Sequence, residues 1–241
     1  MPLPLTTNRL LGALPPAELA AIRPSLRSLT LKLHTPLYET GELIERIYFP
    51  LNSVLSVVTI MLDGSAVEIG TIGHEGLSGS QLIFGAERPA SQMICQMEGE
   101  ACWMDVQGFR RHLDTLAVFR QLVCRYTEAM FNFMGQSIAC NRLHRVNERC
   151  ARWLLLTQDR IGTDSFYLTQ EFLAIMLGTN RPAVTVAAST LQEAGLIQYR
   201  RGRVTIKNRE GLESAACECY SVTAANFRAA LDTGRGLSPA G

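Results

Sequence analysis

The 241-residue sequence has no run of roughly 18 or more apolar residues, so we expect no membrane-spanning helix. Its first residues, MPLP, lack the basic region that opens a secretory signal, and we expect a cytoplasmic protein. No P-loop, no Ser-His-Asp order and no pair of catalytic carboxylates stands in an identifiable context, so we expect no enzyme. The seven cysteines are more typical of reduced thiols than of a disulfide framework.

The net charge of +1 conceals an uneven distribution along the chain. Residues 1–111 hold 8 basic and 11 acidic side chains, whereas residues 142–210 hold 11 basic and 6 acidic ones. A basic excess in one part of a chain indicates a polyanionic partner for that part. The excess is modest, and an ordinary solvated surface would have the same composition.

Residues 29–105 have the pattern of β-structure. The segment LTLKL at 29–33 alternates apolar and polar residues, as a half-buried strand does. At 54–70, two β-branched runs flank Asp63-Gly64, a pair that suits the positive φ of a tight turn and predicts a hairpin. Many short strands with frequent glycines indicate a barrel or a sandwich.

Residues 113–141 have the spacing of a long helix. Apolar residues recur at alternating steps of three and four, with one serine among them. They are Leu116, Phe119, Val123, Tyr126, Met130, Phe133, Ser137 and Cys140. This a/d pattern is typical of a coiled coil, so we predict a dimerisation helix that lies along its copy in a second chain. The alternative is that the stripe packs on the chain's own barrel.

The stretch TQEFLAIMLGTNRPAVTVAASTLQEAG has the pattern of two short helices joined by a tight turn. Thr169 can cap the first helix, which Gly178 ends. Thr179 or Asn180 can cap the second helix, with Pro182 in its first turn. This pattern predicts a helix-turn-helix, the arrangement that places its second helix in the major groove of DNA.

The second helix exposes Arg181, Thr185 and Ser189, and Arg181 at its start is placed for a bidentate contact with a guanine edge. The segment LIQYRRGRVTI then predicts two strands, with Arg200, Arg201 and Arg203 at the tip, as a wing that lies along the DNA backbone. An ordinary packing module would also contain two helices and a hairpin. The predicted DNA-binding residues are Thr169, Gln170, Asn180, Arg181, Pro182, Thr185, Ser189, Arg200, Arg201 and Arg203.

The order of these parts resembles the Crp/Fnr family of bacterial transcription regulators over roughly residues 10–215. The most specific stretch is LTQEFLAIMLGTNRPAVTVAASTLQEAGLI, where Gly178, Arg181, Val184 and Leu191 stand as in that family. The stretch PLYETGELIERIYFPLNSVLSVV is similar to the family's sensor barrel.

The resemblance implies an α+β fold made of an N-terminal antiparallel, jelly-roll-like β-barrel, a long dimerisation helix and a C-terminal winged helix-turn-helix. We place the cyclic-nucleotide-binding-like sensor barrel at 1–112, the dimerisation helix at 113–143, the DNA-binding domain at 144–222 and a flexible tail at 223–241. The resemblance further implies a homodimer on a near-palindromic operator of double-stranded DNA, with RNA polymerase as a partner.

The stretch IGHEGLSGSQLIFGAERPASQ departs from the family's cyclic AMP cassette. Gly76 separates Glu75 from the leucine that should follow it, and Pro89 stands where a serine or threonine would offer an N–H to phosphate. We therefore do not expect cyclic AMP, and the barrel would sense another small effector or serve as a vestigial scaffold. The candidate effector-binding residues are Glu75, Gly76, Arg88, Pro89, Ala90 and Met134, although Glu75 and Arg88 could equally form a surface ion pair.

The cysteines suggest no metal cofactor by position alone. The iron–sulfur sensors of the Fnr type carry an N-terminal cysteine cluster, whereas the first cysteine here is Cys95, so no such cluster is expected. Cys217 and Cys219 could supply half of a tetrahedral metal site or a redox pair, but no second Cys/His pair lies nearby in the sequence. The other cysteines, Cys140 among them, are expected to fill apolar space.

Two functions of other classes remain open from the sequence. One is a ligand-binding signalling protein that uses its C-terminal unit for protein contacts. The other is a metal- or redox-dependent protein that uses Cys217 and Cys219.

Overall fold

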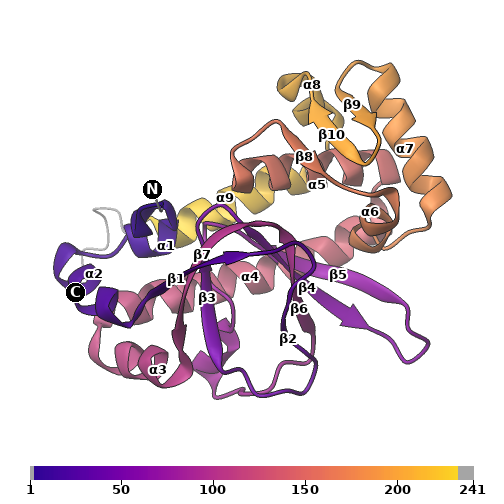
Figure 1. Cartoon of the computed structure of the whole chain (residues 1–241). Coiled ribbons are helices and arrows are strands. Elements are labelled where there is room, and N and C mark those ends of the chain that lie inside the picture. The colour runs from indigo at the N-terminus through magenta and orange to yellow at the C-terminus, as the bar shows by residue number, and fades with distance from the viewer. Residues whose placement is uncertain (1–2, 233–241) are drawn as a thin grey trace, which may run out of the picture.

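The computed structural model describes residues 3–232 and has the predicted α+β architecture (Figure 1). Two antiparallel sheets, of order β1-β7-β3 and β2-β6-β4-β5, form the N-terminal barrel. The strands are β1 (Arg27–Leu31), β2 (Pro36–Tyr38), β3 (Arg46–Pro50), β4 (Val54–Ile60), β5 (Ala66–Ile72), β6 (Gln92–Met97) and β7 (Gly99–Asp105). The hairpin predicted around Asp63-Gly64 is β4 with β5, and Gly64 has φ +83°.

Short helices precede, interrupt and follow the strands of the barrel in the sequence. Before the first strand lie η1 (Leu5–Thr7), α1 (Arg9–Gly12), α2 (Pro16–Ile22) and η2 (Arg23–Ser25). Between β5 and β6 lies η3 (Ser80–Phe84), and after β7 lies α3 (Val106–Thr115). No helix in the described part of the chain is both long and apolar enough to cross a membrane.

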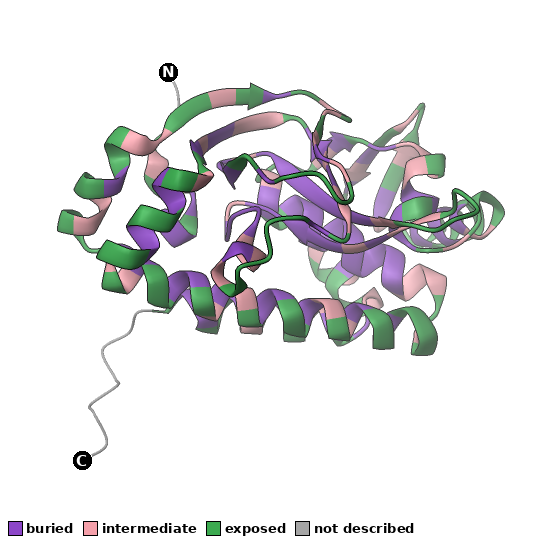
Figure 2. Cartoon of the chain, turned by 90° about the horizontal axis from the view of Figure 1, so that it is seen from below, coloured by how far each residue is buried: buried purple, intermediate pink, exposed green. Residues whose placement is uncertain are grey.

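The long predicted helix is α4 (Ala117–Leu143), which runs along one edge of the molecule with exposed residues on its outer side (Figure 2). The stripe predicted as a seam to a second chain is buried within this chain from Phe119 to Cys140, and Leu116 is partly buried. Its interpretation as a seam between two chains is wrong, because these side chains pack on the chain's own barrel and on α9. The alternative, packing on the barrel, is the one the structure has.

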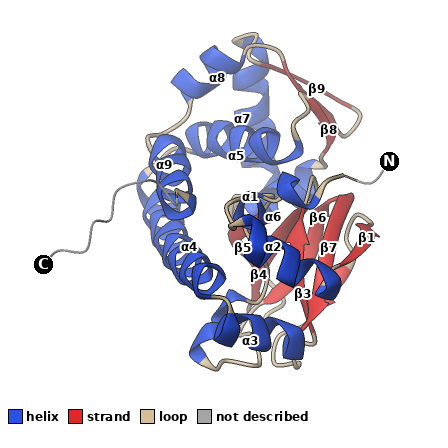
Figure 3. Ribbon diagram, turned by 90° about the vertical axis from the view of Figure 1, so that its left-hand side faces the viewer, coloured by secondary structure: helices blue, strands red, loops and turns tan. Residues whose placement is uncertain are grey.

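The region from residue 223, predicted as a flexible tail, is helical up to Leu231. Helix α9 (Cys219–Leu231) lies beside α4 (Figure 3). Phe227 packs between Tyr126 and Phe133 of α4, with ring centroids 6.0 Å and 5.7 Å away. The prediction is wrong for this part because small residues such as Ala230 are buried against the aromatic face of α4. Residues 233–241 lie outside the described part.

The C-terminal unit consists of helices around a small sheet of order β8-β10-β9. Its elements are α5 (Val146–Ile161), β8 (Ser165–Tyr167), α6 (Gln170–Met176), α7 (Arg181–Glu193), β9 (Ile197–Arg200), β10 (Arg203–Ile206) and α8 (Arg209–Ala215).

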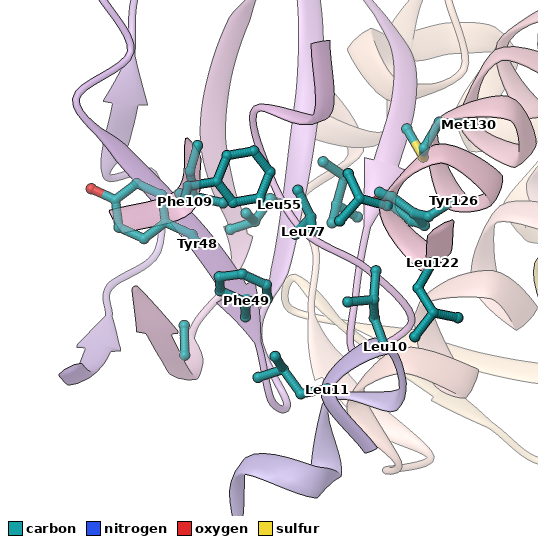
Figure 4. Packing of buried hydrophobic residues seen from close by; sticks show 14 of the residues in the cluster. Leu10, Leu11, Tyr48, Phe49, Leu55, Leu77, Phe109, Leu122, Tyr126 and Met130 are labelled. Carbon is teal, nitrogen blue, oxygen red and sulfur yellow. The ribbon is translucent and has the colours of Figure 1, made fainter. Parts of the chain in front are cut away.

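Two apolar cores hold the molecule together. In the first, Leu122, Tyr126 and Met130 of α4 point toward Leu77 of the barrel and Leu10 of α1 (Figure 4). The second core lies in the C-terminal unit and includes the barrel residues Val54, Val58 and Met97. Because this core is shared, the C-terminal unit is packed against the barrel rather than tethered to it.

Candidate nucleic-acid interface

The two short helices are set by side chains that cap their first turns. Thr169 accepts a hydrogen bond from the backbone N–H of Phe172 at 3.1 Å, and Asn180 accepts one from that of Ala183 at 3.0 Å. Gly178, with φ +56°, makes the turn between them. Each cap satisfies a backbone N–H that the helix itself leaves without a partner. The predicted helix-turn-helix is therefore fixed by local sequence, with Asn180 as the cap of α7.

Helix α7 has one buried and one exposed face. Val184, Ala187, Ala188 and Leu191 are buried under α5 and α6. The exposed face holds four of the predicted DNA-binding residues, namely Arg181, Pro182, Thr185 and Ser189. Its neighbour α6 brings two of their partners, because Arg181 pairs with Glu171 at 3.0 Å and Thr185 donates to Oε1 of Gln170 at 2.9 Å.

Arg181 is the first residue of α7, and its side chain is 61% exposed. The positive end of the α7 dipole and this guanidinium therefore lie at the same place on the surface. An ion pair between two exposed side chains contributes little free energy, so Glu171 does not prevent Arg181 from contacting an anion.

The wing is the hairpin of β9 and β10. Arg201 and Gly202 make its two-residue turn with φ of +50° and +74°, as a type I′ turn requires. Arg200 lies directly across from Arg203. Like charges in this position destabilise a hairpin, and together with Arg201 they concentrate positive charge at its tip.

A groove of about 370 Å³ separates α7 from the wing. Five of the ten predicted residues line it, namely Thr169, Gln170, Arg181, Ser189 and Arg201. Its lining also includes Tyr167, Gln192 and Tyr199, which we did not predict. Tyr167 lies on β8, a strand of three residues that is too short to show a period in the sequence. The groove joins the start of α7 and the wing into one surface.

The predicted effector residues do not form one site. Glu75 is buried, and its Oε1 accepts a hydrogen bond from Nε of Arg160 at 2.8 Å, with Nη2 at 2.7 Å. Arg88 is exposed and donates to the backbone oxygen of Gly41 at 2.7 Å. Glu75 lines a hollow of about 340 Å³ and Arg88 another of about 630 Å³. The alternative of a surface ion pair between Glu75 and Arg88 is therefore wrong, because Glu75 is buried and pairs with Arg160 of α5.

The other effector candidates are placed as follows. Gly76 lies against Tyr126 of α4, and a Cβ at this position would lie 2.0 Å from the tyrosine ring. Met134 is half-buried against the barrel, Pro89 is buried and Ala90 is exposed. The aromatic ring of Tyr126 thus fills the space between the glycine turn and α4.

Cys217 and Cys219 lie away from the groove, at the start of α9. Both are buried, and the structure places them beside Cys140 and His144 at the end of α4. Cys140 fills buried space, as predicted, and its Sγ lies 3.5 Å from Sγ of Cys217.

The whole chain has the fold of known transcription regulators. FixK2 from Bradyrhizobium japonicum is similar over 80% of this chain and 98% of its own, with a TM-score of 0.65 and 13% identity. TTHB099, a transcriptional regulator of the CRP family from Thermus thermophilus, is similar over 78% and 96%, with a TM-score of 0.65 and 20% identity. A putative Crp/Fnr regulator from Eubacterium rectale is similar over 86% and 96%, with a TM-score of 0.63 and 16% identity. At these low sequence identities, the structural similarity establishes the fold of the chain and nothing about its ligand or its DNA sequence.

The comparison is most specific for the C-terminal unit. Residues 148–215 match the model of the Crp-like helix-turn-helix domain. The C-terminal unit is therefore a Crp-like helix-turn-helix domain, and the chain as a whole has the fold of Crp/Fnr regulators. No protein of curated function matches the sequence.

The matched Crp-like domain contains α6, α7 and the wing, and with them all ten residues predicted to bind DNA. The structure brings half of these residues to one groove and places Pro182, Thr185, Arg200 and Arg203 on the exposed surface around it. Their individual contacts with DNA stay a prediction.

Proposed function

We propose that this regulator binds a near-palindromic operator as a homodimer, with one α7 in the major groove of each half-site and the wing on the flanking phosphates. The observation that carries the proposal is the groove between α7 and the wing, which has Arg181 at one border and Arg201 at the other. Arg181 would select guanine, and the wing arginines would contact phosphates irrespective of sequence.

The outer face of α4 supports a dimer. Its exposed residues also recur at steps of four and three, on the side opposite the buried stripe. They are Ala117, Gln121, Cys124, Glu128, Phe131, Gly135, Ile138 and Arg142. Phe131 and Ile138, seven residues apart on this face, are 78% and 73% exposed, so two large apolar side chains of the stripe are free to meet a partner. We assign the seam with a second chain to this face.

The glycine turn of the barrel supports an effector other than cyclic AMP, or none. Glu75 is already paired with Arg160, and Gly76 is covered by the ring of Tyr126. An effector that used Glu75 would have to break a buried ion pair, which costs several kcal/mol. Pro89 has no N–H for a phosphate oxygen.

Contact with RNA polymerase, which the family resemblance implies, stays a prediction.

Salt dependence tests the proposed role of the wing. Arg201→Ala should weaken binding to every duplex and reduce the slope of log affinity against log salt by about 1, because one phosphate contact is lost. The measurement is a fluorescence-anisotropy titration of a labelled duplex at several salt concentrations.

The control for this titration is Arg120→Ala, which removes an exposed arginine of α4 outside the matched domain. It should leave both affinity and slope unchanged. Equal slopes for the wild-type protein and Arg201→Ala would contradict the proposed contact.

A further inference from the structure

Four metal-binding side chains meet at the junction between α4 and the DNA-binding unit. Cys140 and His144 are one helical turn apart at the end of α4. Cys217 lies between α8 and α9, and Cys219 is the first residue of α9. The ligand atoms of these four residues, three sulfurs and one imidazole nitrogen, all lie within 4.8 Å of one another.

Two of the separations in the cluster are close to those of ligands around one tetrahedral ion. Sγ of Cys140 is 3.5 Å from Sγ of Cys217, and Sγ of Cys219 is 3.5 Å from Nδ1 of His144. With Zn–S distances near 2.3 Å, the sulfurs of a tetrahedral site lie about 3.8 Å apart. An iron–sulfur cluster contains several metal atoms and holds its thiolates farther apart, so this set suits a single ion.

Two side chains next to the cluster are placed as they would be around a bound metal. Nε2 of His144 is 3.2 Å from a carboxylate oxygen of Glu218, an arrangement that turns Nδ1 toward Cys219. A histidine that binds a metal commonly donates its other N–H to a carboxylate in this way. The side-chain amide of Gln136 donates to Sγ of Cys219 at 3.0 Å, as it would to a thiolate.

Negative charge at the cluster would also stabilise two buried cations beside it. Arg149 and Arg152 are 5% and 6% exposed, and neither forms an ion pair within residues 3–232. Nε of each guanidinium, and Nη1 of Arg152, has no hydrogen-bond acceptor in this part of the chain. Both arginines interact electrostatically with Cys140. Three thiolates around a divalent ion carry a net charge of −1, which would offset this buried positive charge.

From this geometry we infer that Cys140, His144, Cys217 and Cys219 bind one Zn²⁺ ion. A tetrahedral set of sulfur and nitrogen ligands is the set that zinc prefers. Four protein ligands leave no open position, so the site is structural rather than catalytic. Each cysteine gives up its thiol proton when the metal binds.

The ion would join two parts of the chain that flank the DNA-binding unit. His144 immediately precedes α5, and Cys217 follows α8, so the matched domain at 148–215 lies between the two ligand pairs. A metal at this point would fix the direction in which the DNA-binding unit leaves α4. The site is separate from the DNA-binding groove and does not depend on the function proposed for it.

Cobalt substitution tests the site. The full-length protein is freed of metal with a chelator under reducing conditions and titrated with Co²⁺ alone. We expect a band for thiolate-to-cobalt charge transfer in the near ultraviolet and the intense visible bands of tetrahedral cobalt, both saturating at one ion per chain. Zn²⁺ should displace the cobalt and abolish these bands, because zinc prefers tetrahedral sulfur and nitrogen ligands.

Variants locate the ion. Cys217→Ser should lower the charge-transfer absorbance and the zinc affinity, whereas Cys124→Ser, which removes an exposed cysteine of the same helix α4, should change neither. Glu218→Gln removes no ligand and should lower zinc affinity about tenfold through His144.

Three results would overturn the inference: absence of cobalt bands in the wild-type protein, equal bands in Cys217→Ser and Cys124→Ser, or a Cys140–Cys217 disulfide in protein purified and alkylated without reductant. The first needs no variant, so failure of a variant to fold would not obscure it.

Discussion

Glu68 is a carboxylic acid enclosed at the boundary between the barrel and the DNA-binding unit. It accepts hydrogen bonds from the hydroxyl of Ser56 at 2.7 Å and from the indole N–H of Trp153 in α5 at 3.0 Å. Burial raises the pKa of Glu68 to about 7, although these hydrogen bonds partly oppose the rise. Near neutral pH this group therefore changes charge in a place that links the two units.

The raised pKa makes the stability of the fold depend on pH. The folded protein binds the Glu68 proton more tightly than the unfolded chain, whose ordinary pKa is 4.5. The stabilisation from Glu68 is therefore complete below about pH 4.5 and is lost as pH rises through about 7. Glu68→Gln removes this titration. We expect the difference in free energy of unfolding, wild type minus variant, to fall by on the order of 3 kcal/mol across this window.

Urea denaturation of both proteins at a series of pH values measures this difference. At each pH, the free energy of unfolding of the variant is subtracted from that of the wild-type protein. This subtraction removes the contributions of all other titrating groups that the two proteins share. A difference that stays constant from pH 4.5 to pH 8 would show that Glu68 has an ordinary pKa in the folded protein.

Glu75 shows that neighbouring buried carboxylates can behave in opposite ways. Burial raises the pKa of Glu75, but the charge of Arg160 and its hydrogen bond outweigh this effect, and the pKa lies below its usual range. Glu75 is thus ionised wherever the protein is folded near neutral pH, and its contribution is lost only as pH falls below that of an ordinary glutamate. The barrel and α5 are held by a permanent charge pair at Glu75 and by a titratable contact at Glu68.

At the scale of elements, α4 presents two stripes of the same period. The inner stripe packs on the barrel and α9, and the outer one contains Phe131 and Ile138 in contact with solvent. If the outer stripe is the seam of a dimer, Phe131→Asp should convert the dimer to a monomer, because it places a charge where apolar side chains meet. Sedimentation equilibrium over a range of protein concentrations measures the change.

Phe84 supplies a matched control for this experiment. It is a phenylalanine with the same exposure, 78%, but it lies in η3 of the barrel rather than on α4. Phe84→Asp should leave the dimer intact. A monomeric wild-type protein, or equal dissociation constants for the two variants, would refute the assignment of the seam.

The two stripes also explain which parts of the fold could be predicted from sequence. The period of α4 predicted a long helix with a buried stripe, but a period does not show which neighbour covers the stripe. The stripe is covered by the barrel and by α9, whose Phe227 is 94 residues from Phe133 in the sequence. The helix-turn-helix was predictable because its determinants, the caps at Thr169 and Asn180 and the glycine turn, act within a few residues.

The candidate sites differ in the same way, because some join residues that are close in the sequence and others join residues that are far apart. The arginines of the wing lie within one hairpin, and the sequence was sufficient to place them together. Glu75 meets Arg160 across 85 residues and Cys140 meets Cys217 across 77, and no local pattern predicts such contacts. Cys140 was assigned to the apolar stripe because its spacing fits, although its sulfur faces Cys217.

At the scale of the molecule, the barrel, α4 and the DNA-binding unit are coupled through shared packing. Met176 of α6 approaches Ser56 of β4, and Phe172 of α6 stacks edge-on with His34 of the barrel at 5.2 Å. Helix α6 contacts both the barrel and α7, so we expect a change in the barrel to reach the exposed face of α7 through α6. An effector would act by stabilising one of two such arrangements over the other.

The most direct test of the account is to recover the duplexes that the full-length protein binds from a random pool. We predict an inverted repeat whose half-sites are about one helical turn apart, with a guanine at the same place in each half, because two copies of Arg181 face one side of the duplex. The duplexes recovered with Arg181→Ala should still be inverted repeats, but they should show no preference for guanine at this place. Bound sequences without twofold symmetry, or an unchanged guanine preference in Arg181→Ala, would contradict the proposed binding by a dimer through Arg181.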